Sequence, residues 1–587
     1  MFASFLLLTL PLSLPFDDPP TLDQLEKDIV DMVATGRIAD RKQAEPLAEA
    51  FARRFAVIHD SDLVDGLAED KEKIVAWFDE HPAFRTKLFN AFEEKDDVKA
   101  AMAFFRTLWK KHADKLVKYE DLAIATIVVW DQPGHVHDFR SHVHYTKSEK
   151  PEGQVGGVEN FEYIIAQDAA YGNKGSALPW EFLVFVVDHT TPLAERQWAR
   201  KYVAAAKDKK SWHQDVPYDH DMLASVDGRG AEPHLKGKQY TLANIRENGG
   251  ICMVQADFAA RVGKSVLMPA VYCTGDSAHR GGHAWWMFIR IDAAAAKGPI
   301  KCSLVSDGRI EGFRRDQFYT GTVKDPQTGV DMLDRDMERR LAVTGRDVLA
   351  KRHADNCMRA YALAADKLEY TFKDRVAFVD KVLKLQPYNE AAWVELAELA
   401  KRSEKDPKQR AAILTRLNTM AKTFAAYPDF LWKLFPDLAT VVEKPKERVK
   451  LYQQVIASLM ASARPDLTCA AALAFAEELA KQDQFAEASK TLQDAVRKFP
   501  TEGRYVPKVM SQLEEIGGKY KGGKVEVARL YVELLPAMFA YYKSADDEYC
   551  KKMTDQATKY LDANNLSDYS ARIHSLAASA NTKRKKK

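Results

Sequence analysis

A cysteine preceded by two glycines is the first feature of this sequence that could do chemistry. Cys252 follows Gly249 and Gly250, and mostly small, helix-compatible residues continue from it to Gly263. This pattern predicts that Cys252 lies in the first turn of a helix, with the glycines permitting a close approach of the backbone. Because the positive end of a helix dipole favours an anion, the position would favour a reactive thiolate.

A histidine at the start of an apolar segment could serve this thiol as a base. His283 opens a segment that ends at Ile291, and a second segment follows at 300–306. A thiol nucleophile needs a nearby imidazole, which in turn needs an acceptor that fixes its tautomer. If the two segments form an antiparallel hairpin, the residue opposite His283 lies near position 307 or 308, which favours Asp307. The alternative is that Asp307 serves the backbone of a turn.

Together these residues resemble the transglutaminase-like superfamily, whose members share a papain-like Cys-His-Asp core. The resemblance covers about residues 170–325, and its specific part is 250–285. It implies Cys252 as nucleophile, His283 as base and Asp307 as acid, although the family's acid usually follows its histidine after a shorter hairpin. It also implies a thioester formed from a peptide-like amide or ester and released to water or an amine, with a peptide or protein as substrate.

The oxyanion formed in such a reaction would need hydrogen-bond donors. The backbone amide of Cys252 would be one, and Trp212 or Tyr240, both upstream, could supply the other; the sequence does not choose between them. We expect no cofactor for this chemistry. The competing hypothesis is an inert copy of the fold, in which Cys252 is a structural thiol and His283 a core imidazole, so that the protein is an interaction module.

Two histidine doublets form a separate candidate site. They are His135 with His137, and His142 with His144. Alternate residues of a strand share a face, so each doublet could offer two imidazoles to a metal ion. The competing interpretation, which we favour, is an exposed strand or loop without a metal.

The pattern along the chain predicts a multidomain α plus α/β protein. Residues 17–125 and 339–580 show helical periodicity, whereas 126–338 is mixed and rich in glycine clusters. We therefore expect a helical N-terminal region, a central α+β transglutaminase-like domain and a C-terminal helical array. Segments 377–397 and 473–500 resemble the tetratricopeptide repeat, a helix pair of about 34 residues. Such an array would present a concave surface to a protein partner, or would merely support the middle domain.

Three features of the middle region carry further expectations. The run 127–130 reads as a strand before a turn or as the end of a buried helix. The run 182–187 reads as a buried strand, although its periodicity does not exclude a buried helix. Cys273 and Cys302 fall on neighbouring predicted strands and could form a disulfide if the protein is exported, at a distance that the sequence does not give.

Composition excludes several classes of protein. The chain has 587 residues, which at about 150 per domain suggests three or four domains. Lys and Arg number 86 against 84 Asp and Glu, so the basic surplus of a general nucleic-acid binder is missing. Six cysteines without a CxxC pair exclude a disulfide-built scaffold or a zinc ribbon.

The two ends of the chain carry features that bear on its cellular location. Residues 2–16 are apolar and uncharged, too short for a membrane span of roughly 20 residues but typical of a secretory signal. No basic residue precedes the run and no clear cleavage site follows it, so a misplaced start codon is the alternative. We expect a signal peptide at 1–16, export to the periplasm or the extracellular space (otherwise a cytoplasmic location), and no membrane span after its removal. The basic tail at 581–587 is expected to be a solvated terminus.

Overall fold

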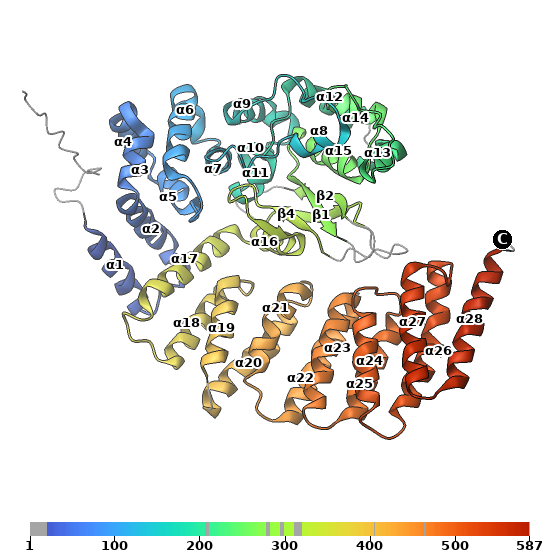
Figure 1. Ribbon diagram of the computed structural model, residues 1–587. Helices are drawn as coiled ribbons and strands as arrows, with labels where there is room; N and C mark the ends of the chain where they lie inside the picture. The colour runs from blue at the N-terminus through green and yellow to red at the C-terminus, as the bar shows by residue number, and fades with distance from the viewer. Residues whose placement is uncertain are drawn as a thin grey trace, which may run out of the picture. The chain divides into compact units, whose positions relative to one another are not determined.

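The computed structural model describes residues 20–205, 211–276, 282–293, 299–309, 320–403, 406–462 and 464–585 (Figure 1). The chain divides into two compact units. Unit 1 comprises Met1–Thr274, Ala284–Arg309 and Thr322–Ala392, and unit 2 comprises Gly275–His283, Ile310–Gly321 and Trp393–Lys587. The expected signal peptide lies outside the described residues.

Unit 1 begins with the helical region that the sequence predicts. Its first helix starts where Thr21 accepts a hydrogen bond from the amide of Gln24 (3.3 Å), an N-cap of the usual kind. The last helix ends at Trp130, so the run 127–130 is the end of a buried helix and not a strand. The elements are α1 (Leu22–Ala34), η1 (Arg41–Gln43), α2 (Ala44–Ile58), α3 (Asp60–Leu67), η2 (Ala68–Asp70), α4 (Lys71–Glu80), α5 (Pro82–Ala91), α6 (Val98–Leu116) and α7 (Glu120–Trp130).

Further helices lead to the cysteine. The run 182–187 lies in α11, so the expected buried strand is wrong there. A helix that packs against α7, α9, α15 and α16 is covered on all sides and needs no polar face, which removes the periodic signal. The elements are α8 (Arg140–Thr146), α9 (Gly157–Gln167), η3 (Asp168–Tyr171), α10 (Lys174–Ala177), α11 (Trp180–Val187), α12 (Leu193–Ala205), η4 (His213–Asp215), α13 (His220–Val226), α14 (Leu242–Asn248) and α15 (Cys252–Ser265).

A five-stranded sheet with the order β3-β2-β1-β4-β5 follows. Its strands are β1 (Ala270–Asp276), β2 (Gly282–Ala293), β3 (Lys301–Asp307), β4 (Thr322–Lys324) and β5 (Asp331–Leu333). The predicted antiparallel hairpin of β2 and β3 is confirmed. Its register differs from the expected one, because Asp307 lies opposite Trp286, three residues beyond His283. The pairing is irregular between Ile291 and Ala293, and sequence alone does not reveal such a shift.

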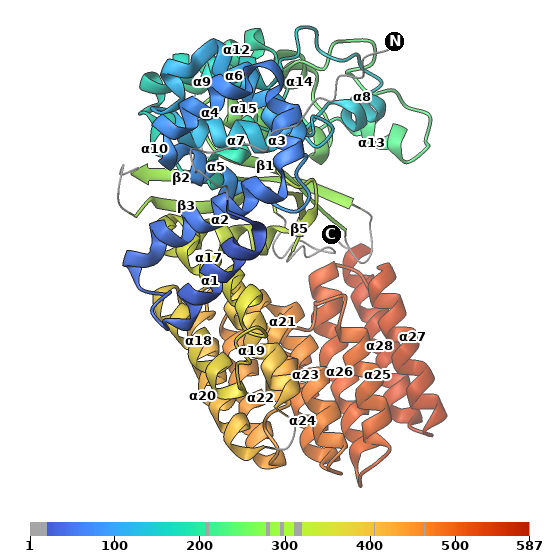
Figure 2. The same ribbon diagram turned by 90° about the vertical axis from the view of Figure 1, so that its left-hand side faces the viewer.

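The sheet is covered on both faces (Figures 1 and 2). Alternate residues Ala284, Trp286 and Phe288 of β2 share one core with residues of α12, α14 and α15. On the other face, α16 (Asp334–Arg346) packs against β3, β4 and β5. The guanidinium of Arg309 lies 5.7 Å from the ring centroid of Trp285 and binds Asp334, the first residue of α16. The sheet is thus the inner layer between α15 and α16.

Unit 1 extends past the boundary expected at residue 339. After α16 it includes α17 (Val348–Ala364) and α18 (Phe372–Leu385), and α17 packs against α1 and α2. The Lys381 amine donates to the carbonyl oxygen of Gly36 (2.7 Å), and Arg41 pairs with Asp347 (2.8 Å). Contacts between segments more than 300 residues apart in the chain explain why local composition misplaced this boundary.

The described part of unit 2 from Trp393 onward is helical, as predicted, and from α20 to α28 each helix packs against the next. Proline occupies the first position of α20, α21, α22 and α23, where its missing N–H is not needed. The elements are α19 (Glu390–Arg402), which begins in unit 1, α20 (Pro407–Thr423), α21 (Pro428–Ala439), α22 (Pro445–Ala461), α23 (Pro465–Ala480), α24 (Phe485–Lys498), α25 (Val506–Gly517), α26 (Gly523–Tyr542), α27 (Glu548–Ala563) and α28 (Ser567–Lys585). The tetratricopeptide type stays a prediction. Within the described ranges, no helix has the length and apolarity required to cross a bilayer.

A buried carboxyl in unit 2 gives a pH-dependent prediction. Burial raises the pKa of Glu502 to about 7, although its carboxylate accepts from the amide of Tyr505 (2.6 Å). A pKa raised by folding stabilises the protein at low pH, and this stabilisation is lost as the pH rises from about 4.5 to 7. We expect unit 2 to be about 2–3 kcal/mol less stable at pH 8 than at pH 5 on this account, and Glu502→Gln to remove that difference.

Urea unfolding of the full chain at the two pH values, followed by pulsed hydrogen exchange in α23–α25, measures this difference in stability. Glu487→Gln, at an exposed position of α24, should leave it intact, and an unchanged pH dependence in Glu502→Gln would contradict the assignment.

Candidate functional site

The helix start at Cys252 is as the sequence predicts. Residue Ile251 is extended and is the N-cap, so Cys252 is the first helical residue of α15. Gly249 has φ +81°, and a Cβ placed there would lie 2.4 Å from the carbonyl oxygen of Pro217. A Cβ on Gly250 would lie 2.4 Å from that of Val254. Both positions therefore require glycine, because a side chain at 249 would meet the Pro217 carbonyl and one at 250 would meet Val254.

Replacing Gly249 should test this construction. Gly249→Ala places a side chain at φ +81° and ψ −173°, a conformation that costs a residue other than glycine about 1–3 kcal/mol, and adds a clash with rigid backbone that costs about 1–3 kcal/mol more. We expect a loss of about 2–5 kcal/mol in urea unfolding of unit 1. The matched control is Gly228→Ala, since Gly228 has φ +72° and a Cβ added there would meet nothing within 4 Å. Gly228→Ala should lose only the stability that the unfavourable backbone conformation costs. Equal losses of unfolding free energy in the two variants would mean that the contact between residue 249 and Pro217 is not tight.

The sulfur of Cys252 lies in a partly buried position among backbone amides. The amides of Ala284, Met253 and Cys252 itself hydrogen-bond to it and favour the thiolate. Burial opposes them and is the larger effect, so the pKa of the Cys252 thiol lies above its usual range. The expectation of a stabilised thiolate is therefore wrong for this state of the protein. The amides at the start of α15 lower the thiol pKa, but the loss of solvation on burial raises it by more.

β2 and β3 place the predicted base, His283, and the predicted acid, Asp307, at positions other than the expected ones. His283 is half-buried and directly precedes Ala284, whose side chain faces the α15 core, so strand alternation directs His283 to the opposite face. The carboxylate of Asp307 accepts from the indole nitrogen of Trp286 (3.0 Å) and lies 3.2 Å from Nδ1 of His213. The expected position of Asp307 opposite His283 is thus wrong, and a different imidazole is its partner.

The surroundings of Asp307 make it a fixed anion. Burial opposes ionisation, but hydrogen bonds from His213 and Ser211 hold the pKa of the Asp307 carboxyl below its usual range. The Ser211 hydroxyl also lies 2.6 Å from Nδ1 of His213. Sequence analysis missed His213. The available signal was its position directly after Trp212, a residue already considered for the site.

Neither expected oxyanion side chain is placed for that role. Trp212 stacks on Trp286 (5.4 Å between centroids), and a Cβ added at Gly263 would lie 3.7 Å from its ring. Gly263 is eleven residues along α15 from Cys252, about 16 Å at the helical rise, so Trp212 belongs to the far end of the helix. Tyr240 is fully buried beside His142 (5.7 Å between ring centroids). The amide of Ala284, which sequence analysis did not consider, is the donor that the structure places beside the sulfur.

Two of the four candidate histidines converge on a carboxylate. His137 Nε2 lies 2.6 Å from Oδ1 of Asp257, and the rings of His137 and His142 are 5.6 Å apart. His142 and His144 belong to α8, and His142 is buried, so both the favoured interpretation of an exposed strand or loop and the alternative of paired ligands on a strand are wrong for this doublet. His144 packs on Tyr145 (5.3 Å between ring centroids). Asp257 was missed, although a charged residue in an otherwise apolar stretch of α15 was the available signal.

Buried charges surround this cluster. Burial lowers the pKa of His142 to about 4, so its imidazole is neutral at neutral pH. Burial would raise the pKa of Asp257, but the imidazoles of His142 and His137 and the guanidinium of Arg261 hold it below its usual range. Arg261 also binds Glu195 (2.7 Å). The cluster therefore combines a carboxylate with a neutral imidazole in a dry environment.

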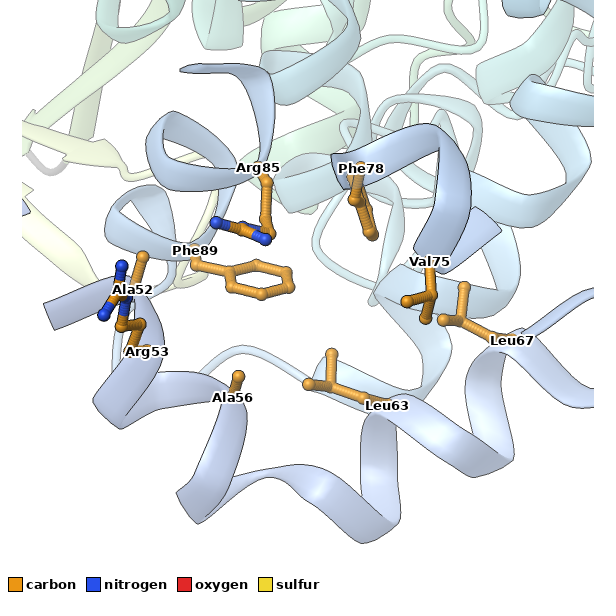
Figure 3. A pocket seen from close by; sticks show the side chains of 9 residues that line it. All are labelled: Ala52, Arg53, Ala56, Leu63, Leu67, Val75, Phe78, Arg85 and Phe89. Carbon is orange, nitrogen blue, oxygen red and sulfur yellow. The ribbon is translucent and has the colours of Figure 1, made fainter. Parts of the chain in front are cut away.

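Other candidate features of the described residues offer less. Asp219, Asp221 and His234 lie together, but Asp219 caps α13 and accepts from the amide of His234 (2.9 Å). A hollow between α2, α3, α4 and α5 is lined by apolar side chains and two arginines, and its volume of about 20 Å³ holds a single water (Figure 3). None of the six cysteines, all of which lie in the described ranges, is part of a disulfide. Cys273 and Cys302 lie on β1 and β3, which β2 separates, and two strand spacings of about 4.8 Å exceed the reach of a disulfide.

No family model matches this chain, and no curated protein or solved structure matches it either. The transglutaminase-like resemblance therefore depends on the residues between 250 and 285 alone.

Proposed function

We propose that the protein is a thiol-dependent enzyme that hydrolyses or transfers acyl groups of peptide-like amides, with Cys252 as nucleophile. One observation carries this proposal: the amides of Ala284 and Met253 converge on a sulfur at the first residue of a helix. Donors fixed in this way stabilise a negative charge without rearrangement, whether it is on the sulfur or on an adjacent carbonyl oxygen. A buried cysteine of the core would gain nothing from them.

In the proposed reaction the Cys252 sulfur attacks the carbonyl carbon, and the carbon–nitrogen bond breaks to leave a thioester. The thiol proton passes to a base and then to the departing amine, and water or a second amine releases the acyl group. The resemblance assigns the base to His283, whose side chain must turn from the opposite face of β2 to reach the sulfur. Asp307 acts as a positioning residue, since its bond to the indole of Trp286 fixes β2 two residues beyond Ala284. The helical array of unit 2 would bind a protein partner or an extended substrate.

A catalytically inert scaffold is the second candidate, and a specific observation favours it. The raised pKa of the buried Cys252 thiol keeps it protonated at neutral pH. Asp307 is also engaged by His213. Under this alternative the helical arrays alone would carry the function, by binding a partner.

Thiol labelling separates the two candidates. Cys252 and Cys302 are both half-buried, whereas the other four cysteines are buried, so Cys302 is the internal reference. The full chain is treated with iodoacetamide at neutral pH, and the alkylated sites are mapped by mass spectrometry. The enzyme hypothesis expects Cys252 to react faster than Cys302 and to slow in His283→Ala. Equal alkylation rates at Cys252 and Cys302, or a Cys252 rate that is unchanged in His283→Ala, would favour the scaffold.

A further inference from the structure

We propose that His137, His142 and Asp257 form a site for one divalent transition-metal ion, with zinc as the expected occupant. The three side chains come from separate segments: the loop before α8, α8 itself and α15. One ligand atom from each residue lies within 4.8 Å of the others. This inference is independent of any reaction at Cys252.

The strongest indication is a polar atom without a partner. The side chain of His142 is 2% exposed, and its Nε2 makes no hydrogen bond within the described part of the chain. A buried polar atom left unsatisfied costs about 1–3 kcal/mol, so native proteins rarely retain one without a reason. Oδ2 of Asp257 is also buried, and its neighbours are the hydroxyl of Tyr240 and Nη1 of Arg261, the latter 3.5 Å away. A cation between these atoms would satisfy both.

The donor set selects the type of ion. Two imidazoles and one carboxylate are ligands that zinc and iron accept, whereas calcium and magnesium require oxygen ligands. Imidazole binds a metal ion through the ring nitrogen that carries no proton. The positive charge of Arg261 would oppose a cation, but its ion pair with Glu195 (2.7 Å) offsets this charge. Tyr240, fully buried with its ring 5.7 Å from that of His142, closes the site toward the core.

The location suggests a structural role. Asp257 is five residues after Cys252 in α15, and α8 is a helix of only seven residues that could not hold its position by itself. An ion held by α8 and α15 would fix the loop at His137 and the first turns of α15 together. Binding energy at such a site adds directly to the stability of the fold.

Metal analysis of the full chain tests the site. The protein is purified without metal-affinity steps and its metals are counted, then it is chelated and titrated with Zn²⁺ in competition with a chromophoric chelator. We expect about one ion per chain and an unfolding midpoint that rises when Zn²⁺ is restored. Asp257→Asn, which keeps the shape of the side chain, and His142→Gln should each weaken binding by more than the roughly 10–100-fold loss typical of groups that only support the ligands.

The matched control is His144→Gln, two residues along α8 at an exposed position, which should bind as the wild type does. If the substitutions prevent folding, the chelated wild type still gives an answer through its response to Zn²⁺ and its visible spectrum with Co²⁺. Stoichiometric iron in place of zinc, lost in Asp257→Asn, would support the same site. A wild type that binds neither metal, or affinity unchanged in both variants, would overturn it and leave an ion pair between His137 and Asp257.

Discussion

Cys252→Ala is expected to abolish formation of an acyl-enzyme, and His283→Ala to slow it by about 10²–10⁴-fold. The first change removes the sulfur to which the amides of Ala284 and Met253 are directed. The second removes the assigned base, whose absence matters because the raised thiol pKa leaves little thiolate at neutral pH. The measurement is the mass increase of the intact chain after mixing with an activated peptide ester, followed over time by mass spectrometry.

Raising the pH should partly rescue the His283 variant. Hydroxide replaces the missing base as the pH approaches the thiol pKa, so the ratio of wild-type to variant rates should fall as the pH rises. Cys302→Ala is the matched control, because Cys302 is the other half-buried cysteine and lies on β3. An acyl adduct that persists in Cys252→Ala, or that is lost in Cys302→Ala, would contradict the assignment of the nucleophile.

The local features of the site were predictable because they depend on neighbouring residues. Two glycines before a cysteine, followed by small helix-forming residues, specify a helix start, and α15 begins at Cys252. An apolar segment after His283 specifies a strand, and β2 forms there. The two apolar segments also predicted the antiparallel pairing of β2 with β3.

The pairings across the site were not predictable, because each depends on a shift that leaves no local trace. The pairing of Ile291 with Cys302 sets Asp307 opposite Trp286, and the partner of Asp307 is His213 in place of the expected imidazole. The pKa of the thiol follows from burial, which only the packed structure determines.

The helical arrays show the same division between local and distant information. Helical periodicity identified the N-terminal and C-terminal regions. The contact between α17 and α1 joins segments more than 300 residues apart, and the local composition of neither segment indicates it. The ligands of the proposed metal site follow the same rule: the histidines were visible as a motif, whereas Asp257 joins them only through the packing of α15.

Glu195→Ala is expected to destabilise unit 1 by about 3–5 kcal/mol, because it removes the shorter of the two ion pairs of the buried guanidinium of Arg261 and leaves only Asp257, at 3.5 Å. Both side chains are nearly inaccessible, with 9% and 1% exposed, and their charged atoms lie 2.7 Å apart. Glu195 also accepts from the amide of Leu242 (2.6 Å), so the substitution removes a second bond that holds the start of α14. Urea unfolding of the full chain, read by pulsed hydrogen exchange in α12 and α15, measures the loss.

The pair of Lys99 and Asp65 separates burial from distance as the cause. Its charged atoms also lie 2.7 Å apart, but the two side chains are 58% and 52% exposed. Asp65→Ala should therefore change the stability by less than about 1 kcal/mol, since water replaces the lost partner. Similar losses at the two sites would mean that Arg261 reaches solvent or finds another carboxylate. Asp257 is the carboxylate within reach, at 3.5 Å, and its capture by Arg261 would then also weaken metal binding at the proposed site.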